Sequence, residues 1–243
     1  MVLVAGMAWS GCARIFTPTP TPTHQQYQID GALEADSSII AYYAPYKQQL
    51  EAEMNRLVGR TAVALTKPGN QPETLLGNFF AEALLDEGKR LAPRAQLSFG
   101  TKGGLRRELQ QGNITIGDLF DVMPFENELV VLELTASHIG QLAQFIAATN
   151  GQPVAGLQLD IRNGKPTNVL IDGAPVHADS TYHLVTYDYL ANGGDNLRGL
   201  DNPVSRKDLG KKVRESLIDY VARHTDNNEI IHAKLDGRIT SDQ

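Results

Sequence analysis

Three short segments combine glycine pairs with charged or aromatic residues, a composition typical of ligand-binding loops. Residues 100–106 read GTKGGLR, residues 123–127 read MPFEN and residues 187–195 read YDYLANGGD. Glycines allow a close approach of the backbone to a ligand, and an arginine offers a planar fork of hydrogen-bond donors. An aromatic ring can stack on a base while a neighbouring amide bonds to its edge. Taken singly, each segment also fits a plainer interpretation, since Gly-Gly-x-Arg occurs in ordinary turns and Phe125 fits a core residue.

The elements that must position these loops are predicted from hydrophobic periodicity. Apolar residues at spacings of three and four predict helices over residues 39–57, 74–90, 137–149 and 209–221. Runs rich in valine, isoleucine and leucine predict strands over residues 62–66, 129–134, 154–161, 168–171 and 182–186. Because helices and strands are mixed along the chain instead of alternating, we expect an α+β or mixed α/β fold with mixed sheets packed against helices. In the last helix, Lys211, Lys212 and Arg214 are expected to form a solvated face.

Composition and charge narrow the classes of function. With 42% hydrophobic and 21% charged residues among 243, the chain has the composition of an ordinary globular protein. Its net charge of −6 provides no overall positive field for nucleic acid or for anionic lipid. The sequence therefore argues against a nucleic-acid-binding protein.

The N-terminus resembles the signal of a bacterial lipoprotein. Residues 2–9 are apolar or small, and Ser10 and Gly11 precede Cys12, the single cysteine. Such a signal is removed and the cysteine then carries lipid. Residues 17–23 alternate threonine and proline, which favours an extended spacer. We therefore expect a signal over residues 1–12, a tether over residues 13–30 and a folded domain over residues 31–243.

This organisation predicts a location for the protein. Lipid on Cys12 would anchor the chain to the bacterial cell envelope, with the folded domain facing the periplasm or the exterior. The alternative interpretation is an incidental cysteine beside a short apolar run.

Taken together, the motifs of the chain resemble the C-terminal, substrate-binding domain of the 5'-nucleotidase family of metallophosphoesterases. The resemblance runs from Ile39 to about Ile218, in the order and spacing of the family, including nineteen positions from Arg106 to Phe125 and six from Tyr189 to Asp195. It implies the fold of that domain. The motifs that carry it are Glu73-x-x-x-Gly77-Asn78, Gly103-Gly104-Leu105-Arg106, Gly112-Asn113-Ile114-Thr115, Pro124-Phe125-x-Asn127, Val154-Ala155-Gly156-Leu157 and Tyr189-x-Ala191-x-Gly193-Gly194-Asp195.

The resemblance also implies roles for individual residues. Phe125 and Tyr189 would sandwich the base, and Asn127 would read its edge. Asp195 would accept hydrogen bonds from the ribose hydroxyls, which a charged carboxylate does more strongly than a neutral acceptor. Arg106 would contact the ribose or the phosphate. The glycines of the same motifs complete the expected substrate-binding set, namely Gly103, Gly104, Gly156, Gly193 and Gly194.

The chain departs from the family pattern in two places. Asn70-Gln71-Pro72 stands where the family commonly has arginines, and Thr101 stands where an asparagine is frequent. Fewer arginines weaken the expected contact with phosphate.

The motifs of a two-metal phosphoesterase do not occur in these 243 residues. Such an enzyme draws metal ligands from Asp-x-His, Gly-Asp, Gly-Asn-His and Gly-His-x-His segments. Gly-Asp occurs at Gly117-Asp118 and Gly194-Asp195, but none of the histidine-bearing segments is present, so both are expected to be loop residues. We therefore expect no metal site, no cofactor and no catalysis by this chain on its own. The two divalent metals would belong to a partner, a separately encoded metallophosphoesterase. Asp188 and Asp195 leave a glycosidase-like acid and base as another interpretation.

Three functions of different classes remain open. The first is a nucleotide-binding subunit that completes an active site with a phosphoesterase partner. The second is a stand-alone periplasmic nucleoside-binding protein. The third is an interaction protein that has kept the fold and lost the ligand. Ligand binding separates the third function from the others, and partner-dependent turnover separates the first from the second.

Overall fold

A computed structural model describes residues 26–31 and 33–242 of the chain. Backbone contacts divide the chain into two compact units, residues 1–44 and residues 45–243. The expected signal, Cys12 and most of the expected tether lie outside the described residues. Across residues 26–31 and 33–242, none of the helices has the length and apolar character that crossing a membrane requires.

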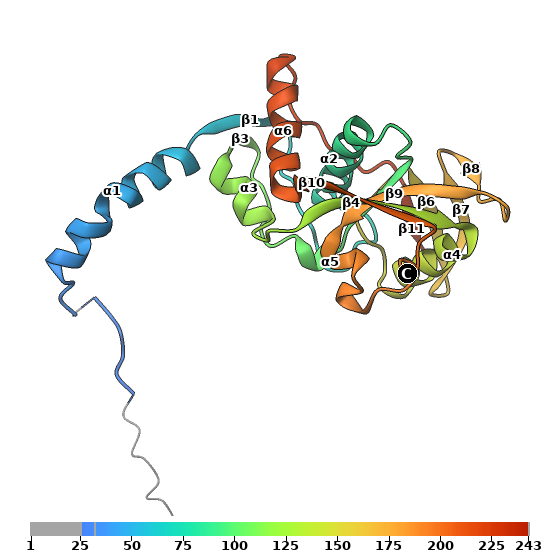
Figure 1. The fold of residues 1–243 in the computed structure, drawn as a ribbon, viewed down its shortest axis with the longest axis horizontal. Helices are drawn as coiled ribbons and strands as arrows, with labels where there is room; N and C mark the ends of the chain where they lie inside the picture. The colour runs from blue at the N-terminus through green and yellow to red at the C-terminus, as the bar shows by residue number, and fades with distance from the viewer. Residues whose placement is uncertain (1–25, 32, 243) are drawn as a thin grey trace, which may run out of the picture. The chain divides into compact units, whose positions relative to one another are not determined.

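The described helices and strands follow one another in mixed order (Figure 1). The helices are α1 (Ser37–Met54), α2 (Leu75–Leu91), α3 (Ile116–Val122), α4 (Ala136–Ala148), α5 (Asp188–Ala191) and α6 (Val213–Asp226), with short 3-10 helices η1 (Lys102–Gly104) and η2 (Gly194–Asn196). The strands are β1 (Leu57–Thr61), β2 (Leu97–Phe99), β3 (Gly112–Thr115), β4 (Glu128–Thr135), β5 (Val154–Ala155), β6 (Leu157–Arg162), β7 (Lys165–Ile171), β8 (Ala174–Pro175), β9 (Thr181–Tyr187), β10 (Ser205–Lys212) and β11 (Ile239–Ser241).

Helix α1 begins in the first unit and continues into the second. The Asp36 carboxylate caps its start, because Oδ1 accepts from the backbone N–H of Ser38 at 2.8 Å and of Ile39 at 3.3 Å. The predicted helix over residues 39–57 is confirmed, although it ends at Met54. None of its residues is buried, so its apolar spacing does not place it in the core.

A five-stranded sheet forms the centre of the second unit. Its strand order is β10-β4-β9-β2-β5, and only the β2–β9 pairing is parallel. Strands β4 and β9 pair from Leu129 opposite Tyr187 to Thr135 opposite Thr181. The sheet is therefore mixed, as the irregular order of helices and strands predicted.

Helix α2 packs directly against this sheet. Its start is capped by Thr74, whose Oγ1 accepts from the backbone N–H of Gly77 at 3.1 Å. Its buried face includes Phe79 and Phe80. A Cβ atom on Gly88 would lie 2.3 Å from Cγ2 of Val185 in β9, so the missing side chain lets the helix approach the strand.

A second sheet has four strands, in the order β11-β6-β7-β8. The sequence predicted one strand over residues 154–161, but the structure divides it at Gly156 into β5 of the first sheet and β6 of the second. Gly156 has φ +70°, and a Cβ atom there would lie 2.1 Å from the carbonyl oxygen of Gln96. The backbone changes sheets at a point where only glycine fits.

The predicted strand over residues 62–66 is wrong by several residues. The strand is β1, and it ends at Thr61. Thr61 Oγ1 donates to the carbonyl oxygen of Val63 at 2.8 Å, and this local bond favours a turn over a continued strand.

The predicted helix over residues 209–221 also needs correction at its start. Residues 205–212 form edge strand β10, which pairs with β4, and helix α6 begins only at Val213. The expected solvated face is wrong for Arg214, which is 7% exposed and places its Cζ atom 3.7 Å from the ring centroid of Phe120. The apolar residues from Leu209 onwards have helical spacing, but pairing with β4 keeps residues 205–212 in a strand.

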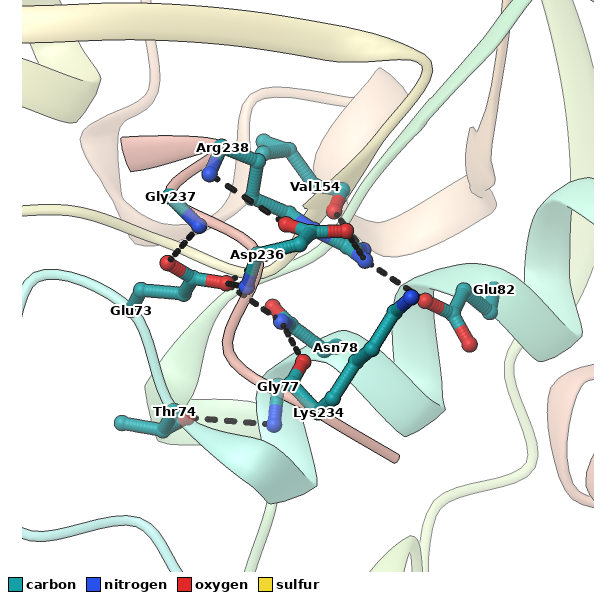
Figure 2. A network of polar contacts seen from close by, with 10 residues as sticks. All are labelled: Glu73, Thr74, Gly77, Asn78, Glu82, Val154, Lys234, Asp236, Gly237 and Arg238. Atoms are coloured by element: carbon teal, nitrogen blue, oxygen red, sulfur yellow. Dashed lines mark hydrogen bonds and ion pairs between the residues drawn. The ribbon is translucent and has the colours of Figure 1, made fainter. Parts of the chain in front are cut away.

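The Glu73-x-x-x-Gly77-Asn78 motif anchors the C-terminal segment (Figure 2). The two carboxylate oxygens of Glu73 accept the backbone N–H groups of Asp236 at 2.9 Å and Gly237 at 3.0 Å. The buried Asn78 amide donates to Glu73 at 2.6 Å and to the carbonyl oxygen of Lys234 at 2.8 Å. In this structure the motif therefore holds residues 234–237 in place through tertiary hydrogen bonds. We call this set of contacts the clasp.

Arg238 extends this clasp to two further elements (Figure 2). Its guanidinium donates to Asp236 at 2.7 Å, to Glu82 of α2 at 2.6 Å and to the carbonyl oxygen of Val154 in β5 at 3.0 Å. The residue is 7% exposed, so these bonds replace most of its hydration. The fold class predicted from the sequence, a mixed α/β fold with mixed sheets and helices, is confirmed.

Candidate functional site

The three loops with glycines and aromatic residues, residues 100–106, 123–127 and 187–195, meet at one end of the strands of the five-stranded sheet. Strands β2 and β9 run parallel, so the loops that follow them emerge on the same side. Strand β4 runs antiparallel to β9 and starts at that side, with Leu129 opposite Tyr187, so residues 123–127 arrive there as well. Segments far apart in the sequence thus line one pocket.

This pocket has a volume of about 620 Å³. Seven of the ten residues predicted for substrate binding line it, namely Gly103, Gly104, Arg106, Phe125, Asn127, Tyr189 and Asp195. The other lining residues are Thr101, Met123, Glu126 and Tyr187, which belong to the same three segments but were not predicted to bind substrate.

Tyr187 forms a buried wall of the pocket. It is 1% exposed, and its hydroxyl lies 3.3 Å from Oγ1 of Thr101. A Cβ atom on Gly104 would lie 3.1 Å from the same hydroxyl, so the glycine leaves room for it. Burial raises the pKa of Tyr187 to about 12, which keeps the phenol neutral at physiological pH. Tyr187 directly follows the predicted strand over residues 182–186 and opens the segment 187–195, and that position at a strand end was the available signal.

Two aromatic residues that line the pocket, Phe125 and Tyr189, are partly exposed. They are 41% and 46% exposed, which is unusual for large aromatic side chains in a well-packed domain. Both line the pocket, so their exposed surface faces a space that a flat ligand can enter.

The loop that carries Phe125 is held in place by charged residues from β10 and α6. Arg214 donates to the Phe125 carbonyl oxygen at 3.4 Å and to the Glu126 carboxylate, and Lys212 also donates to Glu126. Lys212, Arg214 and Glu126 together form a clamp on this loop. Because Arg214 is itself buried over Phe120, the clamp is attached to the core.

This clamp predicts a pH dependence. Hydrogen bonds from Lys212 and Arg214 lower the pKa of Glu126 from 4.5 to about 2. A carboxyl whose pKa is lower in the folded state contributes stability that is complete above its unfolded pKa and is lost as the pH falls through the folded pKa. We therefore expect Glu126→Gln to lower the urea midpoint of unfolding at neutral pH, and the difference from the wild type to shrink below about pH 4.5 and vanish near pH 2. A difference that stays constant on acidification would contradict the clamp.

The Asn127 amide is oriented by a carboxylate from the third loop. Its Nδ2 donates to Oδ1 of Asp188 at 3.0 Å, and the same oxygen accepts the backbone N–H groups of Glu128 at 3.2 Å and Tyr189 at 2.7 Å. Because an ionised carboxylate only accepts, the NH₂ group of Asn127 must face Asp188. This constraint fixes the direction of the Asn127 side-chain carbonyl oxygen. The sequence alone did not identify this constraint.

Three of the predicted glycines do not line this pocket. A Cβ atom on Gly194 would lie 2.5–2.6 Å from three ring carbons of Tyr189, so Gly194 lets that ring lie against the backbone. Gly193 has φ +87° and allows the turn before Asp195. Gly156 separates the two sheets and lines a different cavity of about 410 Å³.

No group of three or more histidine, cysteine, aspartate or glutamate side chains is placed to hold a metal ion among residues 26–31 and 33–242. The chemistry that the described pocket offers is stacking, hydrogen bonding and charge, from Phe125, Tyr189, Asn127, Asp195 and Arg106.

Comparisons with known proteins show which family the chain is similar to. The sequence profile of the family described as "5'-nucleotidase, C-terminal domain" matches residues 57–202. The trifunctional nucleotide phosphoesterase protein YfkN of Bacillus subtilis is 30% identical over 213 residues, which cover 80% of this chain and 14% of that protein. A 5'-nucleotidase of Vibrio vulnificus is 26% identical over 212 residues, which cover 83% of this chain and 37% of that protein.

A solved structure shows the same similarity. The 5'-nucleotidase precursor of Thermus thermophilus aligns with a TM-score of 0.72 at 25% identity, covering 84% of this chain and 42% of that one. The chain therefore spans less than half the length of each of these three relatives. The profile match contains every residue that lines the pocket, and the chain belongs to the 5'-nucleotidase C-terminal domain family.

Proposed function

We propose that this chain binds the nucleoside part of a nucleotide, with the base stacked between Phe125 and Tyr189. The observation that carries the proposal is the convergence of three separate loops on one pocket, whose lining includes the partly exposed Phe125 and Tyr189. A volume of about 620 Å³ is within the range of small-molecule sites. Each stacked face of a base contributes about 1–3 kcal/mol in proteins that bind single-stranded nucleic acid.

The polar residues of the pocket suit the remaining parts of a nucleoside. In this proposal the Asn127 amide, oriented by Asp188, reads the base edge. The Asp195 carboxylate accepts from the ribose hydroxyls, and Arg106 contacts the ribose or the phosphate. Gly103 and Gly104 let the backbone approach the ligand.

We further propose that hydrolysis requires a partner. A separate metallophosphoesterase chain with two divalent metals would act on the nucleotide held in this pocket. The proposal draws support from family membership and from the missing metal-ligand motifs in the 243 residues. The stand-alone nucleoside-binding protein remains the second candidate, because the pocket geometry fits it equally well. The departures at residues 70–72 and Thr101 favour the third candidate, the interaction protein without a ligand.

Isothermal titration of the purified chain tests the binding function. Adenosine, AMP, UMP and UDP-glucose, titrated without metal, are expected to give saturable heat for at least one ligand, because stacking and ribose recognition need no cation. Turnover that appears only when a phosphoesterase is added would support the subunit over the stand-alone binder. Silence across the whole panel would overturn the proposed binding and favour the interaction protein.

The proposed location rests on Cys12. We propose that lipid on this residue anchors the chain to the bacterial cell envelope, with the folded domain facing the periplasm or the exterior. Uptake of labelled palmitate that persists in Cys12→Ala would rule this out.

A further inference from the structure

The hydroxyl of Tyr189 and the main chain and side chain of Asp195 form a closed pair of hydrogen bonds. Tyr189 donates to Oδ1 of Asp195 at 3.0 Å, and its oxygen accepts the Asp195 backbone N–H at 3.2 Å. A phenol has one proton to donate, so this bond sets the direction of its O–H. The pair therefore links the ring to the carboxylate across six positions of the sequence.

The backbone at Asp195 is in a conformation that needs such support. Asp195 has φ 56° and ψ 20°, in the left-handed region that residues other than glycine adopt only at a cost. The preceding Gly194 lies against the Tyr189 ring, where any Cβ atom would collide with it. Ring, backbone and carboxylate thus hold one another in a compact loop.

We propose that the Tyr189 hydroxyl is a positioning group that holds the Asp195 carboxylate in the orientation that receives the ribose. This inference rests on the proposed function. Oδ1 is engaged by the phenol, which leaves Oδ2 and the second lone pair of Oδ1 for the sugar. The ring recognises the base, and the hydroxyl of the same side chain prepares the site for the ribose.

The inference makes base stacking and sugar recognition separable by substitution. Tyr189→Phe keeps the ring and removes only the hydroxyl, so it leaves the stacking surface in place. The loss should therefore appear only with ligands that carry ribose hydroxyls. A residue that merely stabilised the loop would weaken every ligand by the same factor.

The test is isothermal titration of wild type and Tyr189→Phe with adenosine, uridine and their 2',3'-dideoxy counterparts. We expect Tyr189→Phe to weaken the better-binding nucleoside by about fivefold to tenfold, the effect of a misplaced charged hydrogen bond, and its dideoxy counterpart by less than about twofold. In Asp195→Ala the ribose acceptor is gone, so adding Tyr189→Phe should change little, because the two residues act through one contact.

A second readout needs no ligand. Amide hydrogen exchange of Asp195 should be faster in Tyr189→Phe, because its N–H loses its acceptor. Equal weakening of both members of a ligand pair, or unchanged exchange at Asp195, would overturn the positioning role alone. A wild type that binds no nucleoside would overturn the proposed function and this role together.

Discussion

Replacing both Phe125 and Tyr189 by alanine is expected to weaken nucleoside binding by about 30-fold or more. The two rings offer two stacking faces, and the loss of about 1–3 kcal/mol per face gives about 2–6 kcal/mol in total. Both side chains are partly exposed, at 41% and 46%, so their removal leaves the core intact. Titration with adenosine and UMP measures the effect, and thermal unfolding checks that the variant is folded.

The control for this variant is an aromatic residue of similar exposure outside the pocket. Tyr43 of α1 is 42% exposed and does not line the pocket, so Tyr43→Ala should bind as the wild type does. If the double variant kept its affinity within about twofold while folded, the bases would not be held by stacking. Equal loss in Tyr43→Ala would point to a general effect on the protein.

Replacing Arg238 by methionine is expected to lower the free energy of unfolding by about 1–3 kcal/mol. The substitution removes the buried guanidinium and leaves the Glu82 and Asp236 carboxylates without their charged partner. It also breaks the bond to the Val154 carbonyl oxygen, which joins the C-terminal segment to the five-stranded sheet. Urea unfolding of both proteins at neutral pH measures the difference.

An exposed ion pair provides the matched control for Arg238. Arg206 also pairs with an aspartate two residues away, Asp208, but its side chain is 33% exposed and that of Asp208 is 61% exposed, against 8% for Arg238 and 37% for Asp236. Arg206→Met should therefore cost less than about 1 kcal/mol. If the two methionine variants lost equal stability, burial of the Arg238 network would not be what makes it important.

Local patterns in the sequence were sufficient for much of the secondary structure. Helices α2 and α4 lie close to where hydrophobic periodicity predicts them, because each buries one face against the core. Strands β4 and β9 lie close to their predicted apolar runs, because both strands bury consecutive residues and hence both faces. The patterns were less reliable at β10, where pairing with β4 competes with helical spacing. They also did not predict that the strand over residues 154–161 divides at Gly156, because the residue that approaches Gly156 closely, Gln96, lies in another part of the chain.

For the candidate site as well, one part could be predicted from the sequence and another part only from the structure. The sequence alone determined which residue types could bind a nucleoside, through motifs whose order and spacing match one family, and those motifs supplied Phe125, Asn127 and Asp195. Only the tertiary structure decided how Asn127 and the loop of Phe125 are held: Asp188 orients the Asn127 amide, and Arg214 donates to the Phe125 carbonyl oxygen.

The physical reason is the range of the interactions involved. A helix or strand repeats its pattern over neighbouring residues, so its signal is local. The bond between Asn127 and Asp188 spans 61 positions, and the bond between Arg214 and the Phe125 carbonyl spans 89. Such contacts exist only after β4, β9 and α6 have packed together, and no local pattern of residues encodes their geometry.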